Sequence, residues 1–118
     1  RSHINAEKKA LAEKVEALCR DCGGEVSYSG EYAAWEYRGP SKLTELAEQV
    51  FSEQYGSEPK MLTTHGGVEC GILREKMPDL DVISYGPDIN KIHTVNENMS
   101  VASAGRVYDY TLELLKRL

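Results

Sequence analysis

Apolar residues recur at helical spacing in several stretches of the chain, separated by glycine-rich turns. Residues 6–22 carry one such stripe, formed by Leu11, Val15, Leu18, Cys19 and Cys22. A period of three and four residues predicts an amphipathic helix. Asn5 is the predicted N-cap, and Gly23-Gly24 is the predicted stop.

Three further helices are predicted by the same pattern. Residues 41–55 have a predicted buried face of Leu43, Leu46, Ala47, Val50 and Phe51, with Ser41 as the cap and Gly56 as the end. Residues 68–76 predict a short helix. Residues 102–118 predict a closing helix whose inward face consists of Ala104, Val107, Tyr108, Thr111, Leu115 and Leu118.

Short apolar or alternating runs between the helices predict strands at 25–29, 60–64 and 81–85. Residues 30–40 have no clear period and are interpreted as a connector, and 88–100 as an irregular polar loop. Helices and strands therefore alternate along the chain. This order predicts an α/β layer structure with parallel strand pairing in its second half.

Composition and charge indicate which classes of molecule this protein is not expected to bind. The 118 residues suit one modest domain, with 41% hydrophobic and 28% charged residues. The net charge is −5 and no Lys/Arg run is present, which argues against nucleic acid as a partner. No apolar stretch approaches the ~20 residues of a membrane span. Three cysteines, an odd number, favour a reducing cytoplasm over a disulfide framework.

The first residue is Arg1, not methionine. We interpret the chain as a processed product or a piece of a longer protein. No secretory signal is visible in it, and any such segment would lie before Arg1.

The run His65-Gly66-Gly67-Val68-Glu69-Cys70-Gly71 is the first candidate for chemistry. Its glycines allow backbone amides to approach a ligand, and the start of a helix favours anionic groups. Glu69 could act on a substrate amine or orient a metal-bound group. Spacing alone favours the alternative, a glycine-rich turn followed by a capping acid.

His93 is the second candidate, with Glu97 four residues further on. Neutral imidazole is the commonest metal ligand, but a zinc site needs three or four ligands. By itself His93 is more often a surface loop residue. Cys19 and Cys22 lie at a helix C-terminus, where the dipole does not activate a thiol, so core packing is predicted. Trp35 is predicted to anchor the connector.

Five blocks occur in a fixed order along the chain, namely Arg1-Ser2 before a helix, Gly30-Glu31-Tyr32 with Trp35, the run 65–71, Ile83-Ser84-Tyr85-Gly86-Pro87, and His93 with Glu97. They span essentially the whole chain, and together they are much more specific than any one of them. In this order they resemble the aminoacyl-histidine dipeptidases, members of the two-zinc exopeptidase group that includes carnosinase and aminoacylase.

The resemblance implies the C-terminal part of a zinc-exopeptidase catalytic α/β domain, preceded by the last helix and strand of an inserted α+β lid domain. Residues 1–38 would be the end of the lid, which often dimerises, with the crossing segment. Residues 39–118 would be the catalytic part. A fragment that lacks the neighbouring segments of its domains exposes strand edges and apolar faces, so we expect this chain to self-associate. The full-length parent protein is expected to be a homodimer.

The resemblance also implies the chemistry of a cytoplasmic dipeptidase acting on Xaa-His dipeptides, including those of the β-Ala-His type. Two zinc ions would polarise the scissile carbonyl and activate water. His93 matches the last zinc ligand, and His65, Gly66, Gly67 and Glu69 match the loop that lines the substrate pocket. The other ligands and the general base would lie before Arg1, so the chain alone is expected to be inactive.

Some positions depart from the family pattern. His93-Thr94-Val95-Asn96-Glu97 stands where His-Ser-Pro-Asp-Glu is expected, Tyr32-Ala33-Ala34-Trp35 where Tyr-Pro-Gly-Trp is expected, and His65-Gly66-Gly67 where His-Ala-Gly is expected. The missing proline and aspartate affect loop rigidity and contacts around the ligand, not the ligand itself. The alternative hypothesis is a free-standing small α/β module that binds a ligand or partner.

Overall fold

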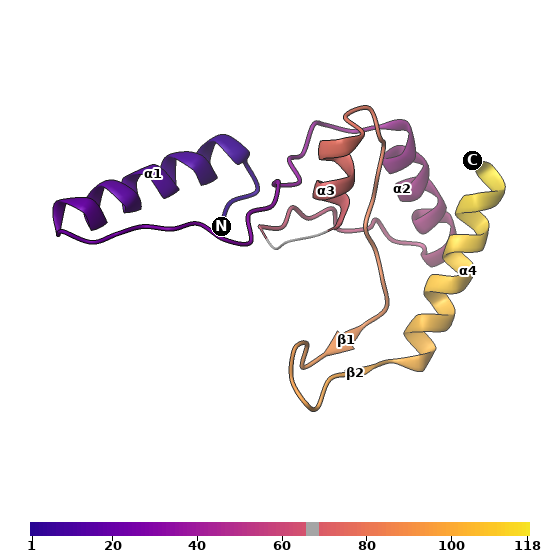
Figure 1. Cartoon of the computed structure of the whole chain (residues 1–118). Helices are drawn as coiled ribbons and strands as arrows, with labels where there is room; N and C mark the ends of the chain where they lie inside the picture. The colour runs from indigo at the N-terminus through magenta and orange to yellow at the C-terminus, as the bar shows by residue number, and fades with distance from the viewer. Residues whose placement is uncertain (66–68) are drawn as a thin grey trace. The chain divides into compact units, whose positions relative to one another are not determined.

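The computed structural model describes residues 1–65 and 69–118. These residues form two units: the first consists of 1–39 and 61–80, and the second of 40–60 and 81–118. The first unit contains helices α1 (Asn5–Asp21) and α3 (Glu69–Lys76). The second contains helices α2 (Lys42–Tyr55) and α4 (Val101–Arg117) and strands β1 (Ile89–Asn90) and β2 (Asn98–Met99) (Figure 1).

Helix α1 confirms the helix predicted over residues 6–22, but its start differs. The N-cap is Ile4, which makes no side-chain capping bond. The Oδ1 atom of Asn5 instead accepts a hydrogen bond of 2.8 Å from the Ala34 N–H. Asn5 therefore joins the helix to the connector, and its prediction as a cap was wrong.

The apolar stripe of α1 is exposed within the described structure. Leu11, Val15 and Leu18 are 51%, 49% and 66% exposed, and α1 has no buried residue. The predicted strand 25–29 is absent; this segment runs extended along α1 (Figure 1). Tyr28 contacts α1 through its hydroxyl, which donates to the Ala12 carbonyl at 3.2 Å. The alternation predicted as a strand thus reflects contact with a helix.

Helix α3 lies against the connector at Gly71, which is buried, as is its neighbour Cys70. A Cβ atom on Gly71 would stand 2.9 Å from the Ala33 carbonyl oxygen and 3.2 Å from the Trp35 nitrogen. Only glycine allows this approach without displacement of the backbone. Arg74 extends the contact by donating to the Glu36 carbonyl at 3.3 Å.

Helices α2 and α4 pack together to form the core of the second unit (Figure 1). Its buried residues are Ala47, Val50, Tyr110 and Leu114. The Tyr110 hydroxyl donates to the Ala47 carbonyl at 2.9 Å, so the ring is buried without an unpaired polar atom. Full burial of one aliphatic side chain such as Val50 contributes about 1.5–3 kcal/mol.

The ends of α2 are as predicted. Ser41 and Thr44 form a capping box, in which each side chain accepts from the other residue's backbone N–H. Gly56 ends the helix in the left-handed conformation, with φ 66°. Asp81 adds a second cap because its carboxylate accepts from the Ser41 hydroxyl at 2.7 Å and from the Leu43 N–H at 3.1 Å.

The buried face of α4 is rotated from the predicted one. Ser103, Tyr110 and Leu114 are buried, whereas Tyr108, Leu115 and Leu118 are 64%, 61% and 73% exposed. Apolar residues lie on both sides of this helix, so periodicity alone could not identify the side that meets α2.

The predicted strands 60–64 and 81–85 are absent from the described residues, and so is parallel pairing. The sheet that the structure describes is an antiparallel pair within the predicted loop, with Ile89 opposite Met99 and Asn90 opposite Asn98. Residues 81–85 instead contact helices: Ile83 packs on the α2–α4 core, and the Tyr85 ring meets Tyr110 edge-on at 5.0 Å. The described residues thus combine helices with one small antiparallel sheet, and the predicted α/β layers with parallel pairing are not found among them.

Candidate functional site

The predicted metal ligand, His93, lies in the hairpin loop between β1 and β2. His93 is exposed, and its backbone is in the left-handed region, with φ 65°. The Glu97 carboxylate accepts a hydrogen bond of 2.7 Å from the His93 backbone N–H. The loop therefore holds an imidazole at the surface, where a ligand can reach it.

The base of this hairpin is joined to the start of α4. Asp88 accepts from the Ser100 N–H at 3.0 Å through its carbonyl and donates its own N–H to the Ser103 hydroxyl at 2.7 Å. Arg106 adds an ion pair of 3.3 Å with the Asp88 carboxylate. Ser103 is buried, so the loop that carries His93 begins at a fixed point of the second unit.

The predicted substrate residues belong to the first unit. Glu69 opens α3 and is exposed, and His65 is also exposed, with its ring 6.1 Å from that of His3. A carboxylate in the first turn of a helix is favoured by the helix dipole, which agrees with a capping role as well as with ligand binding. Gly66 and Gly67 lie outside the described residues.

Cys70 follows Glu69 in the first turn of α3. It is buried, and burial raises the pKa of its thiol above the ordinary value. Cys70 thus remains a neutral, packed thiol rather than a nucleophile.

A metal site is not complete within the described residues. Over 1–65 and 69–118, no three His, Cys, Asp or Glu side chains gather closely enough to hold an ion. The exposed imidazole of His93 fits the role of one ligand among several. His65 and Glu69 belong to the first unit, and His93 belongs to the second.

The other predicted residues have mixed outcomes. Trp35 is half-buried, and its backbone nitrogen adjoins α3 at Gly71. This approach is made by the backbone, so the anchoring role of the indole ring stays a prediction. Cys19 is half-buried but Cys22 is exposed, and both are free thiols. Core packing was therefore the wrong prediction for Cys22.

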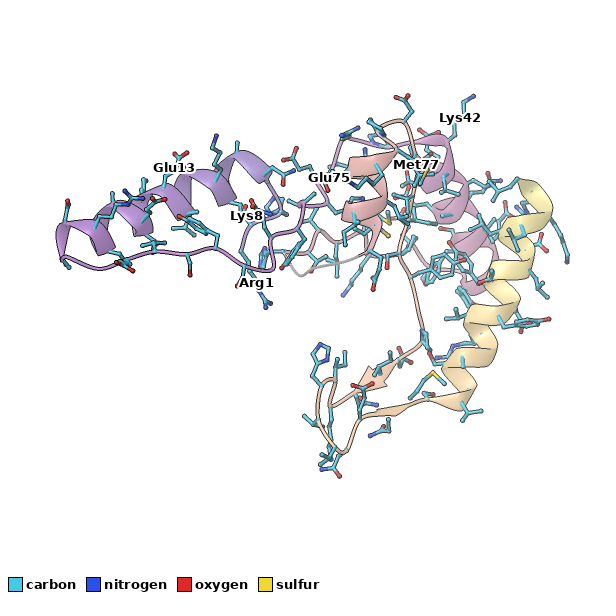
Figure 2. The ribbon with its side chains drawn as sticks, viewed as in Figure 1. Arg1, Lys8, Glu13, Lys42, Glu75 and Met77 are labelled. Carbon is cyan, nitrogen blue, oxygen red and sulfur yellow. The ribbon has the colours of Figure 1, made fainter. Side chains whose placement is uncertain are left out.

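A cavity of about 900 Å³ opens on the first unit. Its lining includes Arg1, Lys8 and Glu13, together with Glu75 of α3 (Figure 2). Lys8 donates to the Tyr32 carbonyl and lies 5.2 Å from the centre of the Tyr32 ring. Both signs of charge are mixed along this cavity, so it shows no preference for one class of charged ligand.

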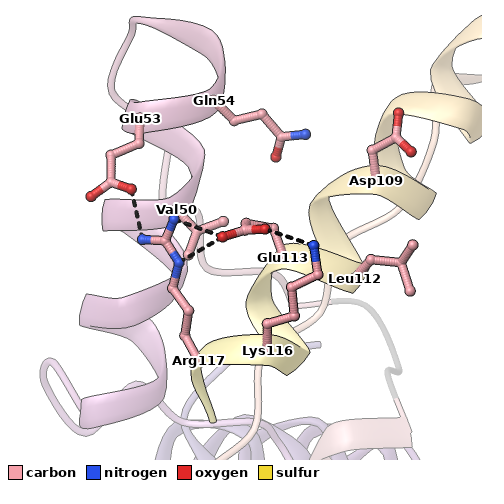
Figure 3. Close-up of a pocket in the computed structure, with 8 residues that line it drawn as sticks. All are labelled: Val50, Glu53, Gln54, Asp109, Leu112, Glu113, Lys116 and Arg117. Atoms are coloured by element: carbon pink, nitrogen blue, oxygen red, sulfur yellow. Dashed lines mark hydrogen bonds and ion pairs between the residues drawn. The ribbon is translucent and has the colours of Figure 1, made fainter.

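A second hollow, of about 500 Å³, lies between α2 and α4, where a charged cluster joins the two helices (Figure 3). The Arg117 guanidinium donates to Glu53 at 2.6 Å and to Glu113 at 2.8 and 3.0 Å. Sequence reasoning missed this cluster. The pair Glu113 and Arg117 was visible as residues four apart on a helix, but nothing local indicated Glu53.

Hydrogen bonds lower the pKa values of both carboxylates. For Glu53, the largest lowering of the pKa comes from the hydrogen bond of the Gln49 amide, and the next from the Arg117 guanidinium. For Glu113, the largest lowering comes from Arg117, and the next from Lys116. The pKa of Arg117 is raised in turn by Glu53 and Glu113. This cluster fastens the end of α4 and has no group suited to catalysis.

Among the helices of the described residues, none is both long and apolar enough to cross a bilayer.

The chain is similar in sequence to known peptidases. The pattern of peptidase family M20/M25/M40 matches residues 4–117. The cytosol non-specific dipeptidase of Escherichia coli (strain K12) is 26% identical over 118 residues, which are all of this chain and 24% of that protein.

Among solved structures, the aminoacylhistidine dipeptidase from Vibrio alginolyticus has the same fold in the matching part. Its TM-score is 0.80 at 24% sequence identity, over 99% of this chain and 24% of that one. The chain thus spans about a quarter of the length of the relatives that it matches.

Proposed function

Because this chain belongs to peptidase family M20/M25/M40, we propose that it forms part of a metal-dependent dipeptidase. The observation that carries the proposal is the family match over residues 4–117. The names of the two similar proteins support the narrower activity, since both are dipeptidases. The chain spans a quarter of their length, so the remaining catalytic groups would come from further polypeptide.

The proposed substrates are dipeptides with a C-terminal histidine, including the β-Ala-His type. Support comes from the ordered sequence blocks and from the name of the Vibrio alginolyticus protein. The Escherichia coli protein is named as non-specific, which makes a broader range of dipeptides the alternative outcome.

His93 would supply one imidazole to a two-zinc centre, as its exposed position on the hairpin allows. Bound zinc polarises a carbonyl and lowers the pKa of bound water to about 7. In the first unit, Glu69 would face the substrate amine, and His65 with the amides of Gly66 and Gly67 would line the pocket. The general base would come from outside this chain.

The proposed organisation follows the resemblance. Residues 1–38 would be the end of a lid domain and its crossing segment, and residues 39–118 part of the catalytic domain. The parent would be a cytoplasmic homodimer. The name of the cytosolic relative supports the location.

A direct test extends the reading frame upstream of the Arg1 codon and assays the encoded protein. We expect several hundred codons with a His-x-Asp motif, and hydrolysis of β-alanyl-histidine and alanyl-histidine that a chelator abolishes and zinc restores. The 118-residue chain is the control and should hydrolyse neither dipeptide. Peptidase activity of the short chain with added zinc would contradict the proposal.

The alternative function is a free-standing binding module, and the core that α2 and α4 form within one unit of the chain favours it. A start codon at or directly before Arg1, together with a compact monomer in solution scattering, would support the module and exclude the dipeptidase.

A further inference from the structure

The backbone of His93 adopts a conformation that needs support. A non-glycine residue at φ 65° lies in the small left-handed region, which L-residues rarely occupy. Lys91 in the same loop is also left-handed, at φ 52°. Such residues persist only where surrounding contacts hold them, and they are concentrated at functional sites.

Most of the loop is held by one turn centred on Thr94. Its N–H and its hydroxyl both donate to the Lys91 carbonyl, at 3.2 and 2.7 Å. Its carbonyl accepts from the Glu97 N–H at 3.1 Å, and its hydroxyl accepts from the Asn96 N–H at 3.3 Å. None of these bonds reaches the backbone of His93.

Glu97 supplies the missing contact. Its Oε2 atom accepts from the His93 N–H at 2.7 Å, the short distance of a charge-assisted hydrogen bond. In the described residues this bond joins the His93 backbone to the far side of the loop. The spacing of four residues suggests a pair on a helix face, but here the side chain closes a hairpin loop instead.

We propose that Glu97 is a positioning residue, whose carboxylate holds His93 in the left-handed conformation and so sets the direction of its imidazole. This role depends on the proposed function, because it assumes that His93 binds a metal ion. A change of φ from the left-handed to the right-handed region turns the Cα–Cβ bond by about 120° about the N–Cα axis. Without the Glu97 bond, the imidazole would spend most of its time pointing away from a metal fixed by other ligands.

The first test follows the loop itself by NMR in the 118-residue chain, with no metal present. Glu97→Ala should speed hydrogen exchange at the His93 amide and change its three-bond coupling and Cα shift from left-handed values. Glu97→Gln keeps an acceptor oxygen on a side chain of equal length, so it should restore most of both. Glu58→Ala removes another exposed glutamate, one outside this loop, and should change neither. An unchanged His93 amide in Glu97→Ala would overturn the proposal.

The second test measures zinc affinity in the longer enzyme of the proposed function. Glu97→Ala should weaken zinc binding about 10- to 100-fold, the range found when groups that orient a ligand are removed. Glu97→Gln should bind zinc within a few-fold of the parent. Equal affinity in Glu97→Ala, with weakened binding in His93→Ala, would overturn the positioning role alone. Full affinity in His93→Ala would contradict the proposed function itself.

Discussion

At the scale of single residues, Gly71 decides how α3 meets the connector. The absent side chain leaves room for the Ala33 carbonyl, which an added Cβ would approach to 2.9 Å. Backbone atoms line this contact, so they cannot swing aside as a flexible side chain would.

Gly71→Ala should destabilise the first unit by about 1–3 kcal/mol. Urea unfolding followed by fluorescence of Trp35, the chain's one tryptophan, reports directly on this contact. Gly105→Ala is the matched control, because an added Cβ there meets nothing within 4 Å. It should stabilise α4 slightly, since alanine favours helices. Equal effects of the two substitutions would contradict this account of Gly71.

Glu53 and Glu113 make the second unit sensitive to acid. Their folded-state pKa values lie below the ordinary glutamate value of 4.5, so the unfolded chain binds protons more readily than the folded one. Stability from this cluster is complete above pH 4.5 and is lost as the pH falls through the lowered folded values. The cluster is exposed, which keeps the effect small.

Folded Arg117→Gln should therefore lose less thermal stability than the parent chain when the pH is lowered from about 5 to about 3, the range in which carboxyl groups titrate. Thermal unfolding followed by circular dichroism at several pH values measures this loss. Lys14→Gln removes an exposed lysine from α1 and is the control. A pH profile that stays the same in Arg117→Gln would show that the cluster does not contribute.

At the scale of elements, the helices were predictable and the strands were not. Local periodicity and capping residues such as Ser41 and Gly56 determine a helix, and both were readable. A strand forms only by pairing with another strand, and the local sequence does not indicate which segment that partner is. Alternation at 25–29 and 81–85 arose from contact with helices, through Tyr28 and Ile83. The rotation of α4 was equally hidden, because both of its sides carry apolar residues.

Ser41→Ala removes the capping box of α2 and the hydroxyl that bonds Asp81. It should cost about 0.5–2 kcal/mol. Ser57→Ala, at an exposed position just beyond the same helix, should be nearly neutral. Urea denaturation followed by circular dichroism separates them, and equal midpoints would exclude a stabilising cap.

Adjacent leucines of α4 test its observed orientation. Leu114 is 4% exposed and Leu115 is 61% exposed. Leu114→Ala should cost about 2–5 kcal/mol, and Leu115→Ala at most about 0.5 kcal/mol. Chemical denaturation of both variants provides the measurement. A larger cost at Leu115 would favour the face predicted from the sequence.

At the scale of the whole molecule, the order of short motifs along the sequence is enough to identify the family. The family match over residues 4–117 confirms that identification. The candidate site stays a prediction, which the sequence gives only as a set of residues, because a site is made by chain segments brought together in space. His93 was named by resemblance, whereas its left-handed backbone and the bond from Glu97 depend on how the loop folds.

The zinc content of the longer dipeptidase that we propose, with and without His93, tests the central claim most directly. The proposed enzyme should hold two zinc ions per active site, and His93→Ala should lose one of them and nearly all dipeptide hydrolysis. Glu58→Ala should keep both ions and full activity. Two retained zinc ions and unchanged hydrolysis in His93→Ala would contradict the claim that this chain supplies a metal ligand.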